Sequence, residues 1–243
     1  MNSPHITLPT TDFLRPQPFP AILPQGVTGI GARFGQGEFS EQLFHSHEIY
    51  FPEDIRRSVT KRQSEFLAGR ILAGHNLALM GVRGFDIVND EMRCPQWPKG
   101  VVGSISHADA VACCITAPDT LFQGVGVDVE NIMAVKTVEE IRISIVNQQE
   151  SLLMRQFSAL ADNVLFTAVF SAKEAIYKAL YPSVRRFFDF SAVNLTGIEA
   201  DRELLQFEVT ESLAAGYGVG TKIAVHFRVQ ASLLYSWCLL QAA

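Results

Sequence analysis

The sequence predicts a mixed α/β (α+β) fold made of two halves, each containing a helix followed by strands. Apolar residues recur at helical spacing over residues 59–80, and again between residues 135 and 181. Short strand-like stretches follow both helical segments, over residues 101–130 and 204–240. Apolar residues make up 48% of the 243-residue chain and charged residues 19%, which is enough to build a hydrophobic core.

The first 40 residues are rich in Pro and Gly, so we expect irregular structure there, with one short strand near Ala32–Phe34. The first clear helix is predicted over residues 59–80, because apolar side chains return every three or four positions. Gly81 follows as a helix stop, since glycine is favoured just past a helix end. The proline-containing segment 94–100 is predicted to be a loop.

Three strand-like stretches surround the middle of the chain. The first two, Val101–Ser106 and Ala110–Thr116, are predicted to form a hairpin-like pair. In the third, residues 122–130, valines alternate with Gly126, Asp128 and Glu130. Because side chains alternate across a strand, the third stretch is predicted to have one apolar face and one acidic face.

The remainder of the chain is predicted to be two helices followed by strands. The helices are expected over residues 135–146 and 148–181, with Pro182 ending the series. A Gly-rich turn lies among the strands, which are expected over residues 204–210, 222–229 and 232–240. We therefore place the boundary between the two halves at residue 122, giving halves 1–121 and 122–243.

Composition excludes several classes of protein. The start of the chain lacks the basic and apolar pattern of a signal peptide, and no apolar run is long enough for a transmembrane segment, so we expect a cytoplasmic protein. The four cysteines lack the paired spacing of a zinc site, and we expect reduced, buried thiols. A net charge of −5 argues against nucleic acid as a partner.

A first candidate for chemistry is the pair Asp128 and Glu130. Two residues apart on a strand, their carboxylates point to the same side, with Cα atoms about 6.5 Å apart. Hard oxygen ligands of this kind suit Mg²⁺, and Gly126 on the same face would leave space for a ligand. The alternative is an ordinary solvated strand face.

A second candidate is the helical segment 170–178, in which Glu174 and Lys178 are four residues apart and share one face. They can therefore reach the same ligand. Two simpler interpretations remain open, namely a surface ion pair between these residues, or a capping box formed by Ser171 and Glu174.

The first half holds two further candidates. The segment Gly103–His107 ends a strand with hydroxyl and imidazole groups, Ser106 and His107, which can contact a phosphate. The helix that precedes it carries Arg62 and Arg70 two turns apart. A structural histidine and a solvated basic helix face are the simpler interpretations of these two features.

Taken together, these motifs resemble the paired signature of the 4'-phosphopantetheinyl transferases. GVGVDVE is followed some forty residues later by FSAKEAIYK, and RQSEFLAGR and WPKGVVGSISH precede them. The order is similar to the larger monomeric type of the family, which includes enterobactin synthase component D and Sfp. The resemblance covers about residues 56–190, and it departs from many relatives at Phe170, where they carry Trp.

The resemblance implies two similar halves related by a pseudo-twofold, with the active site between them. It implies that Asp128, Glu130 and Glu174 bind Mg²⁺, and that Glu174 and Lys178 are catalytic. It places the nucleotide-binding elements for coenzyme A in the first half and the metal and catalytic motifs in the second. Residues implied to bind coenzyme A are Arg62, Arg70, Ser106, His107, Lys173 and Lys178, with the role of Lys173 left open.

The implied reaction moves the 4'-phosphopantetheine arm of coenzyme A onto a serine of an acyl, peptidyl or aryl carrier protein and releases 3',5'-ADP. Siderophore or other secondary-metabolite synthesis is the implied setting. Because such carriers are acidic, we expect them to dock on 132–145 or on the cluster Arg185–Phe188.

Two other functions remain as alternatives. The chain could be a non-catalytic module that binds coenzyme A or a carrier, although Asp128, Glu130, Glu174 and Lys178 are all present. It could instead be another Mg²⁺-dependent phosphoryl enzyme, such as a nucleotide hydrolase, but the chain lacks a P-loop sequence. A metal site at His45 and His47 is disfavoured because no third ligand lies nearby in the sequence.

Overall fold

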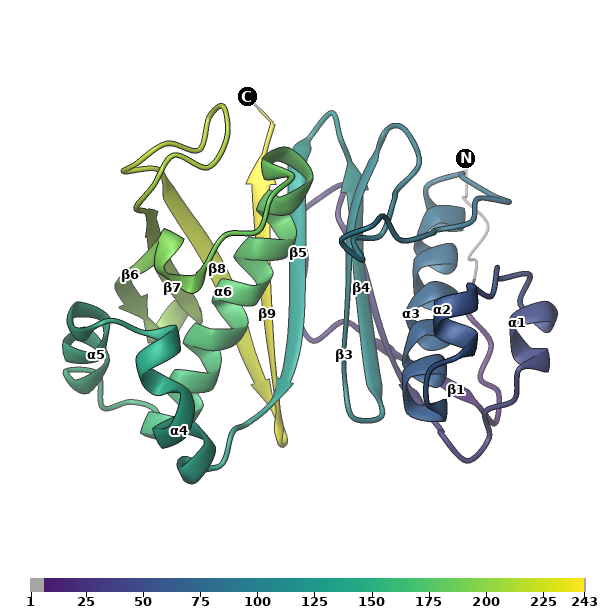
Figure 1. Cartoon of the computed structure of the whole chain (residues 1–243), viewed down its shortest axis with the longest axis horizontal. Coiled ribbons are helices and arrows are strands. Elements are labelled where there is room, and N and C mark those ends of the chain that lie inside the picture. The colour runs from purple at the N-terminus through teal and green to yellow at the C-terminus, as the bar shows by residue number, and fades with distance from the viewer. Residues whose placement is uncertain (1–6, 243) are drawn as a thin grey trace. The chain divides into compact units, whose positions relative to one another are not determined.

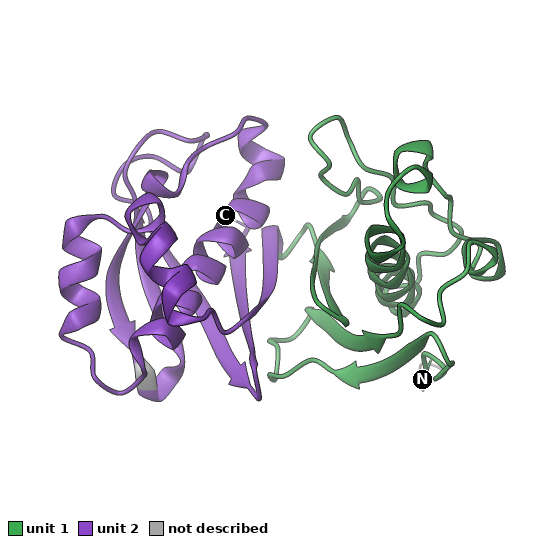
Figure 2. Ribbon diagram, turned by 60° about the horizontal axis from the view of Figure 1, so that its bottom comes forward, with its two compact units in different colours: residues 1–121 green, residues 122–243 purple. Residues whose placement is uncertain are grey.

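The computed structural model of the chain describes residues 7–242 and contains two compact units. Unit 1 comprises Met1–Leu121 and unit 2 comprises Phe122–Ala243, as Figure 2 shows in two colours. Each unit holds one antiparallel sheet and one long helix that packs on it (Figure 1). This mixture of helices and antiparallel strands is the α+β arrangement that the sequence predicts.

Unit 1 has a four-stranded sheet in the order β1-β2-β4-β3. Helix α3 packs against β2 and β4, and it buries Phe66, Leu67 and Leu72 in the core of the unit. The elements of unit 1 are β1 (Leu14–Pro18), β2 (Thr28–Phe34), α1 (Gln42–Ser46), α2 (Glu53–Arg56), α3 (Thr60–Leu79), β3 (Val101–Ala108) and β4 (Val111–Pro118).

Unit 2 has a five-stranded sheet in the order β5-β9-β8-β7-β6. Helix α6 lies along β5 and β9, and α4 and α5 contact α6 (Figure 1). The elements of unit 2 are β5 (Phe122–Asn131), α4 (Val135–Ile145), α5 (Gln148–Arg155), α6 (Asp162–Val184), η1 (Phe190–Ala192), β6 (Val193–Glu199), η2 (Ala200–Arg202), β7 (Leu204–Val209), β8 (Lys222–Gln230) and β9 (Leu233–Gln241).

Helix α6 approaches β5 closely because β5 carries glycine where the two elements meet. A Cβ atom built on Gly126 would lie 1.9 Å from the carbonyl oxygen of Ala175, and one built on Gly124 would lie 2.2 Å from that of Ala179. The prediction that Gly126 leaves space for a ligand is therefore wrong, since the backbone of α6 occupies that space. The acidic face of β5 is the face that α6 covers.

Most predicted elements are present, but the prediction of one helix over 148–181 is wrong. At 1.5 Å per residue such a helix would be about 51 Å long, which is too long for a domain of this size. The chain instead breaks over residues 156–161, between α5 and α6, where Phe157 and Leu160 pack against the core. Helix α6 also runs two residues past Pro182, to Val184.

The N-terminal third contains more regular structure than its composition predicts. The strand expected at Ala32–Phe34 is the end of the longer β2, which pairs with both β1 and β4. Cys113, Cys114 and Cys238 are buried free thiols as expected, whereas Cys94 is only half-buried. Within residues 7–242, no helix is long and apolar enough to cross a membrane.

Candidate active site

The carboxylate of Asp128 joins strand β5 to helix α6. Its Oδ1 accepts a hydrogen bond from Lys178 Nζ at 2.7 Å, and its Oδ2 accepts one from Ser171 Oγ at 2.8 Å. Lys178 Nζ also donates to the carbonyl oxygen of Val127 at 3.1 Å. Asp128 is only 3% exposed, so the interpretation of a solvated strand face is wrong for this residue.

Strand pairing supplies a further member of this cluster. Ser236 of β9 lies opposite Asp128 in the sheet, so both side chains point to the same face. The hydroxyl oxygens of Ser171 and Ser236 are 2.6 Å apart. Because Ser171 gives its one proton to Asp128, Ser236 must donate to Ser171. This chain of hydrogen bonds fixes the Asp128 carboxylate against α6.

Glu174 lies one turn before Lys178 on the same face of α6 and is half-buried. Burial raises the pKa of its carboxyl group above the ordinary value, and the negative charge of Asp128 raises it further. The ammonium of Lys178 acts in the opposite direction. Glu174 is therefore within electrostatic reach of both charged groups. Ser171 lies inside α6, so the capping-box interpretation is wrong.

The third predicted metal ligand, Glu130, is half-buried near the end of β5. Among the residues that the structure describes, no three or more His, Cys, Asp or Glu side chains are arranged so that they could hold a metal ion. The predicted ligands Asp128, Glu130 and Glu174 are thus not gathered into a ready-made set. Their assignment as metal ligands stays a prediction.

Lys173 points into a different cluster from Glu174. Its Nζ lies 2.7 Å from Glu150 Oε1, and it donates to the carbonyl oxygens of Ile145 at 2.9 Å and Phe190 at 3.1 Å. Burial lowers the pKa of Lys173, and the charge of Glu150 opposes this shift. With its side chain 1% exposed, Lys173 does not join the residues that the sequence predicts to bind coenzyme A.

In unit 1, Arg62 of α3 contacts His107 of β3, with Nη1 and Nε2 2.9 Å apart. A guanidinium can only donate, so Nε2 is the acceptor and His107 carries its proton on Nδ1. That nitrogen faces Glu65 Oε2 at 3.6 Å, and Arg62 lies 3.8 Å from the same oxygen. Burial raises the pKa of Glu65, while Lys61 and Arg62 lower it. Arg62, His107 and Glu65 therefore form one cluster, a proximity that the sequence alone does not predict.

Ser106 and His107 are consecutive residues of β3, so their side chains point to opposite faces of the sheet. His107 points to the face covered by α3, as Ile105 does, and Ser106 is buried on the other face. The two side chains are thus not presented side by side, although the sequence predicts that both contact one phosphate.

Arg70 is buried and holds a neighbouring loop. Its Nε donates to the carbonyl oxygen of Ile87 at 2.7 Å and Nη2 to Asn89 Oδ1 at 2.5 Å, while its guanidinium carbon lies 4.2 Å from the centre of the Phe66 ring. Burial lowers the pKa of Arg70 to about 10. Two of its donating groups are therefore committed inside unit 1.

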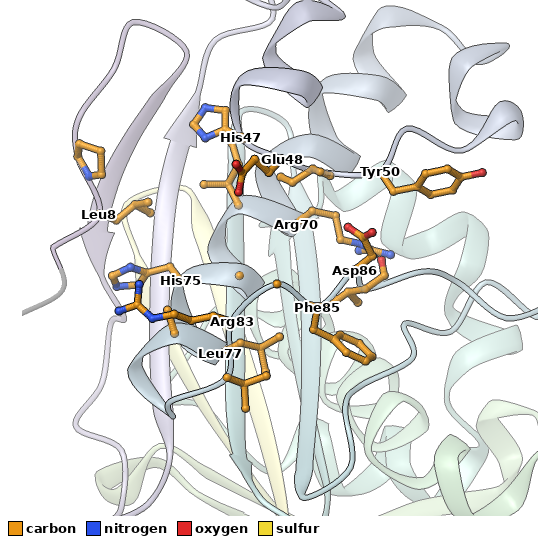
Figure 3. A pocket seen from close by; sticks show the side chains of 18 of the residues that line it. Leu8, His47, Glu48, Tyr50, Arg70, His75, Leu77, Arg83, Phe85 and Asp86 are labelled. Atoms are coloured by element: carbon orange, nitrogen blue, oxygen red, sulfur yellow. The ribbon is translucent and has the colours of Figure 1, made fainter.

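Arg70 also lines a cavity of about 570 Å³ within unit 1 (Figure 3). The close-up shows Arg70 and Asp86 on one side and His75 with Arg83 on the other. Arg62, Ser106 and His107 are not among the lining residues. Arg70 thus lies apart from the Arg62–His107 pair, and mixed charges surround it.

Sequence reasoning missed several partners of these residues. Ser171 could have been found, because it shares the face of Glu174 and Lys178 at positions i, i+3 and i+7. The pattern Asn147-x-x-Glu150 predicts a capping box, which the structure contains. No sequence signal marks Ser236, because only the pairing of β9 with β5 brings it to Asp128.

Comparisons with known proteins agree with these motifs. The model described as "4'-phosphopantetheinyl transferase N-terminal domain" matches residues 51–117, and that of the "4'-phosphopantetheinyl transferase superfamily" matches residues 124–226. The chain is 36% identical to enterobactin synthase component D of Salmonella typhi over 173 residues, covering 70% of this chain and 71% of that one.

Two other comparisons extend this result. The chain is 31% identical to 4'-phosphopantetheinyl transferase Npt of Nocardia iowensis over 176 residues, covering 72% of this chain and 74% of that one. A solved holo-(acyl-carrier-protein) synthase from Bacillus anthracis str. Ames aligns with 51% of this chain and 99% of its own, at 12% identity and a TM-score of 0.36, which is too low to establish a common fold. On the family models and the sequence relatives, the chain belongs to the 4'-phosphopantetheinyl transferase superfamily.

Proposed function

We propose that this protein transfers the 4'-phosphopantetheine group of coenzyme A to a serine of an acyl, peptidyl or aryl carrier protein and releases 3',5'-ADP. The observation that carries the proposal is the cluster of Asp128, Glu174 and Lys178 where α6 covers β5. This cluster lies in the part of the chain that matches the superfamily model. The reaction is phosphoryl transfer, which needs positioning and neutralisation of charge more than covalent catalysis.

In this reaction the serine oxygen attacks the β-phosphorus of coenzyme A, and the bond from that phosphorus to the oxygen of 3',5'-ADP breaks. The serine proton passes to Glu174, whose half-buried carboxylate lies on the same face of α6 as Lys178 and close to Asp128. Lys178 is 27% exposed at its side chain, so its ammonium can contact phosphate oxygens as well as Asp128. A positive charge at this place stabilises the charge that develops on the transferred group.

We propose Mg²⁺ as the metal, with Asp128, Glu130 and Glu174 as its ligands. The donor set fits, because carboxylate oxygens are the ligands that Mg²⁺ prefers. It also fits electrostatically, since the Asp128 charge raises the pKa of Glu174 and a cation would relieve this repulsion. A bound Mg²⁺ would supply neutralisation of the phosphate charge.

We assign nucleotide binding to unit 1 and transfer to unit 2. The Arg62–His107 pair is the best candidate to bind a phosphate of coenzyme A, because it combines a guanidinium with an imidazole that are both partly exposed. Ser106 and Arg70 remain weaker candidates, since Ser106 faces the opposite side of the sheet from His107 and Arg70 is committed to Ile87 and Asn89.

The carrier is proposed to dock on unit 2, on one of two exposed surfaces. Helix α4 exposes Ile143 by 92% and Val135 by 62%, beside the basic residue Lys136. The second surface is the cluster Arg185–Phe188, in which Phe187 is 68% exposed. Exposed apolar groups next to basic ones would suit a carrier protein that presents an acidic, partly apolar helix around its acceptor serine.

We further propose that the protein is a cytoplasmic monomer that serves siderophore or other secondary-metabolite synthesis. The support for the pathway is that several relatives bear the name enterobactin synthase component D. The alternative is a module that binds coenzyme A or a carrier without transferring the arm.

Intact mass spectrometry of candidate apo-carriers separates these functions. Each carrier is incubated with coenzyme A, Mg²⁺ and the protein, and a matched sample contains a carrier whose acceptor serine is replaced by alanine. We expect one carrier to gain the mass of phosphopantetheine with release of an equal amount of 3',5'-ADP, and the alanine carrier to gain nothing. Binding of coenzyme A without any gain of mass would support the non-catalytic module.

A further inference from the structure

We propose that Lys173 is a positioning residue: it is fixed by Glu150, holds the segment Phe187–Phe190 against α6 through its bond to the Phe190 carbonyl oxygen, and so fixes the surroundings of Glu174. The inference rests on the proposed transfer reaction for its kinetic consequence only. Lys173 immediately precedes Glu174 in α6, so any displacement of one changes the position of the other. It is not a catalytic residue, because its ammonium is buried and bonded to Glu150, Ile145 and Phe190.

All three protons of the Lys173 ammonium are used inside unit 2. One points to Glu150 Oε1 at 2.7 Å, and the others are donated to the carbonyl oxygens of Ile145 at 2.9 Å and Phe190 at 3.1 Å. Each side chain of the Lys173–Glu150 pair is 1% exposed. Lys173 therefore ties α6 to the last turn of α4 and to η1.

Glu150 extends these ties to two other elements. Its Oε2 accepts from the backbone N–H of Asn147 at 2.8 Å, which closes the capping box of α5. Its Oε1 accepts from the backbone N–H of Leu195 in β6, also at 2.8 Å. One buried ion pair thus sets the distances between α6, the start of α5 and β6.

The segment held in this way forms a wall beside Glu174. A cavity of about 230 Å³ is lined by Lys173, Glu174, Tyr177, Phe187–Phe190 and Val193. The ring of Tyr177 packs against Phe188, with centroids 4.8 Å apart. The hydrogen bond from Lys173 to the carbonyl oxygen of Phe190 holds the C-terminal end of the segment Phe187–Phe190. Glu174 therefore lines a cavity whose other lining segment, Phe187–Phe190, is held in place by Lys173.

A buried ion pair is a costly way to stabilise a fold, because both charges lose their hydration and apolar residues of the same size often do as well. What distinguishes the Lys173–Glu150 pair is its geometry. With three acceptors around one ammonium, the elements that carry these acceptors can be held in only one position relative to α6. We infer that this arrangement is what the pair contributes next to Glu174. The contribution should appear in the rate of transfer more than in binding of coenzyme A.

The test compares the double variant K173M/E150Q with the wild type. The single variant K173M would leave the Glu150 carboxylate buried without its cation and is prone to unfold, whereas the double variant carries no unpaired charge. The matched control is K222M/E208Q, which removes the exposed Lys222–Glu208 ion pair between β8 and β7. K173R is the conservative variant, because it keeps the charge but cannot offer the same three hydrogen bonds.

We expect K173M/E150Q to fold, to bind coenzyme A within about threefold of the wild-type Kd, and to lose at least tenfold in single-turnover rate at saturating coenzyme A. K173R should fall between the double variant and the wild type, and the control should match the wild type. Equal single-turnover rates for K173M/E150Q and wild type would overturn the inference.

Hydrogen exchange measured by mass spectrometry provides a readout that does not depend on activity. In K173M/E150Q, amides of residues 187–190 should exchange at least tenfold faster than in the wild type, while those of the β7–β8 hairpin should not change. Unchanged exchange over residues 187–190 would also overturn the inference. If the wild type itself transferred nothing, the proposed function would fail, and the exchange result would still decide whether Lys173 holds this segment.

Discussion

Lys178 Nζ lies 2.7 Å from Asp128 Oδ1, and this ion pair connects the helix motif to the strand motif. In the sequence these two residues are fifty positions apart, and their motifs look like separate features. In the structure they form one cluster, in which Glu174 responds to the charges of both residues. The ion pair also means that a metal at Asp128 must share this carboxylate with Lys178. The electrostatics of the cluster can therefore be tested without any ligand.

The first prediction concerns the pKa of Glu174 in the metal-free protein. The Lys178 ammonium lowers this pKa and the Asp128 carboxylate raises it. Removing Lys178 in K178M should therefore raise the pKa of Glu174, and neutralising Asp128 in D128N should lower it. The measurement is a pH titration of the ¹³C carboxyl shift of Glu174. Shifts in the same direction for both variants would contradict the arrangement described here.

The second prediction concerns the two strand carboxylates. D128N and E130Q should each lose most of the transfer activity, at least about a hundredfold, because both remove a charged oxygen ligand. Asp128 also accepts two hydrogen bonds in a buried site, so D128N should cost about 1–3 kcal/mol of stability, whereas E130Q should cost less. Thermal unfolding and single-turnover transfer are measured on the same samples. Near wild-type turnover for either variant at saturating Mg²⁺ would remove that residue from the proposed metal site.

The third prediction tests the close approach of α6 to β5. In G126A the new Cβ would lie 1.9 Å from the Ala175 carbonyl oxygen, so α6 or β5 must move, at a cost of about 1–3 kcal/mol or more. Gly218 in the same unit has nothing within 4 Å of such a Cβ, so G218A should be neutral or slightly stabilising. Urea unfolding of both variants gives the comparison. Equal stability of G126A and wild type would show that α6 does not pack on β5 at this distance.

The fourth prediction concerns the 3'-phosphate of coenzyme A. The wild type should bind coenzyme A more tightly than its analogue without that phosphate, by about 1.5–3 kcal/mol for each charge-assisted contact. H107A should reduce the difference in affinity between the two ligands more than S106A does, because only His107 contacts Arg62. Calorimetry with both ligands measures the effect. Equal affinity of the wild type for the two ligands would remove phosphate binding from this part of unit 1.

Much of the fold could be predicted because it depends on local patterns. The spacing of apolar residues predicted α3 and α4, and alternation predicted β5 with its acidic face. The length of the expected helix signals a break, but the position of that break between α5 and α6 could not be predicted, since apolar residues continue at helical spacing through residues 156–161. β6 was missed because seven residues of mixed polarity carry little strand signal.

The candidate site was predicted only in part, for a related reason. Spacing along one element places Glu174 with Lys178 and Asp128 with Glu130, but contacts between elements depend on register and packing. Alternation along a strand would have separated Ser106 from His107 without a structure. The burial of Lys173 against Glu150 had no such local signal, because it depends on how α5 packs on α6.

The measurement that tests the central claim most directly is single-turnover transfer by E174Q across a Mg²⁺ titration, with coenzyme A affinity determined by calorimetry. If Glu174 takes the serine proton, E174Q should bind coenzyme A as the wild type does and should lose about two to four orders of magnitude in rate at every Mg²⁺ concentration. If Glu174 acts mainly as a metal ligand, added Mg²⁺ should restore much of the rate. Transfer by E174Q at the wild-type rate without extra Mg²⁺ would contradict the account, because Glu174 would then be neither the base nor a required metal ligand.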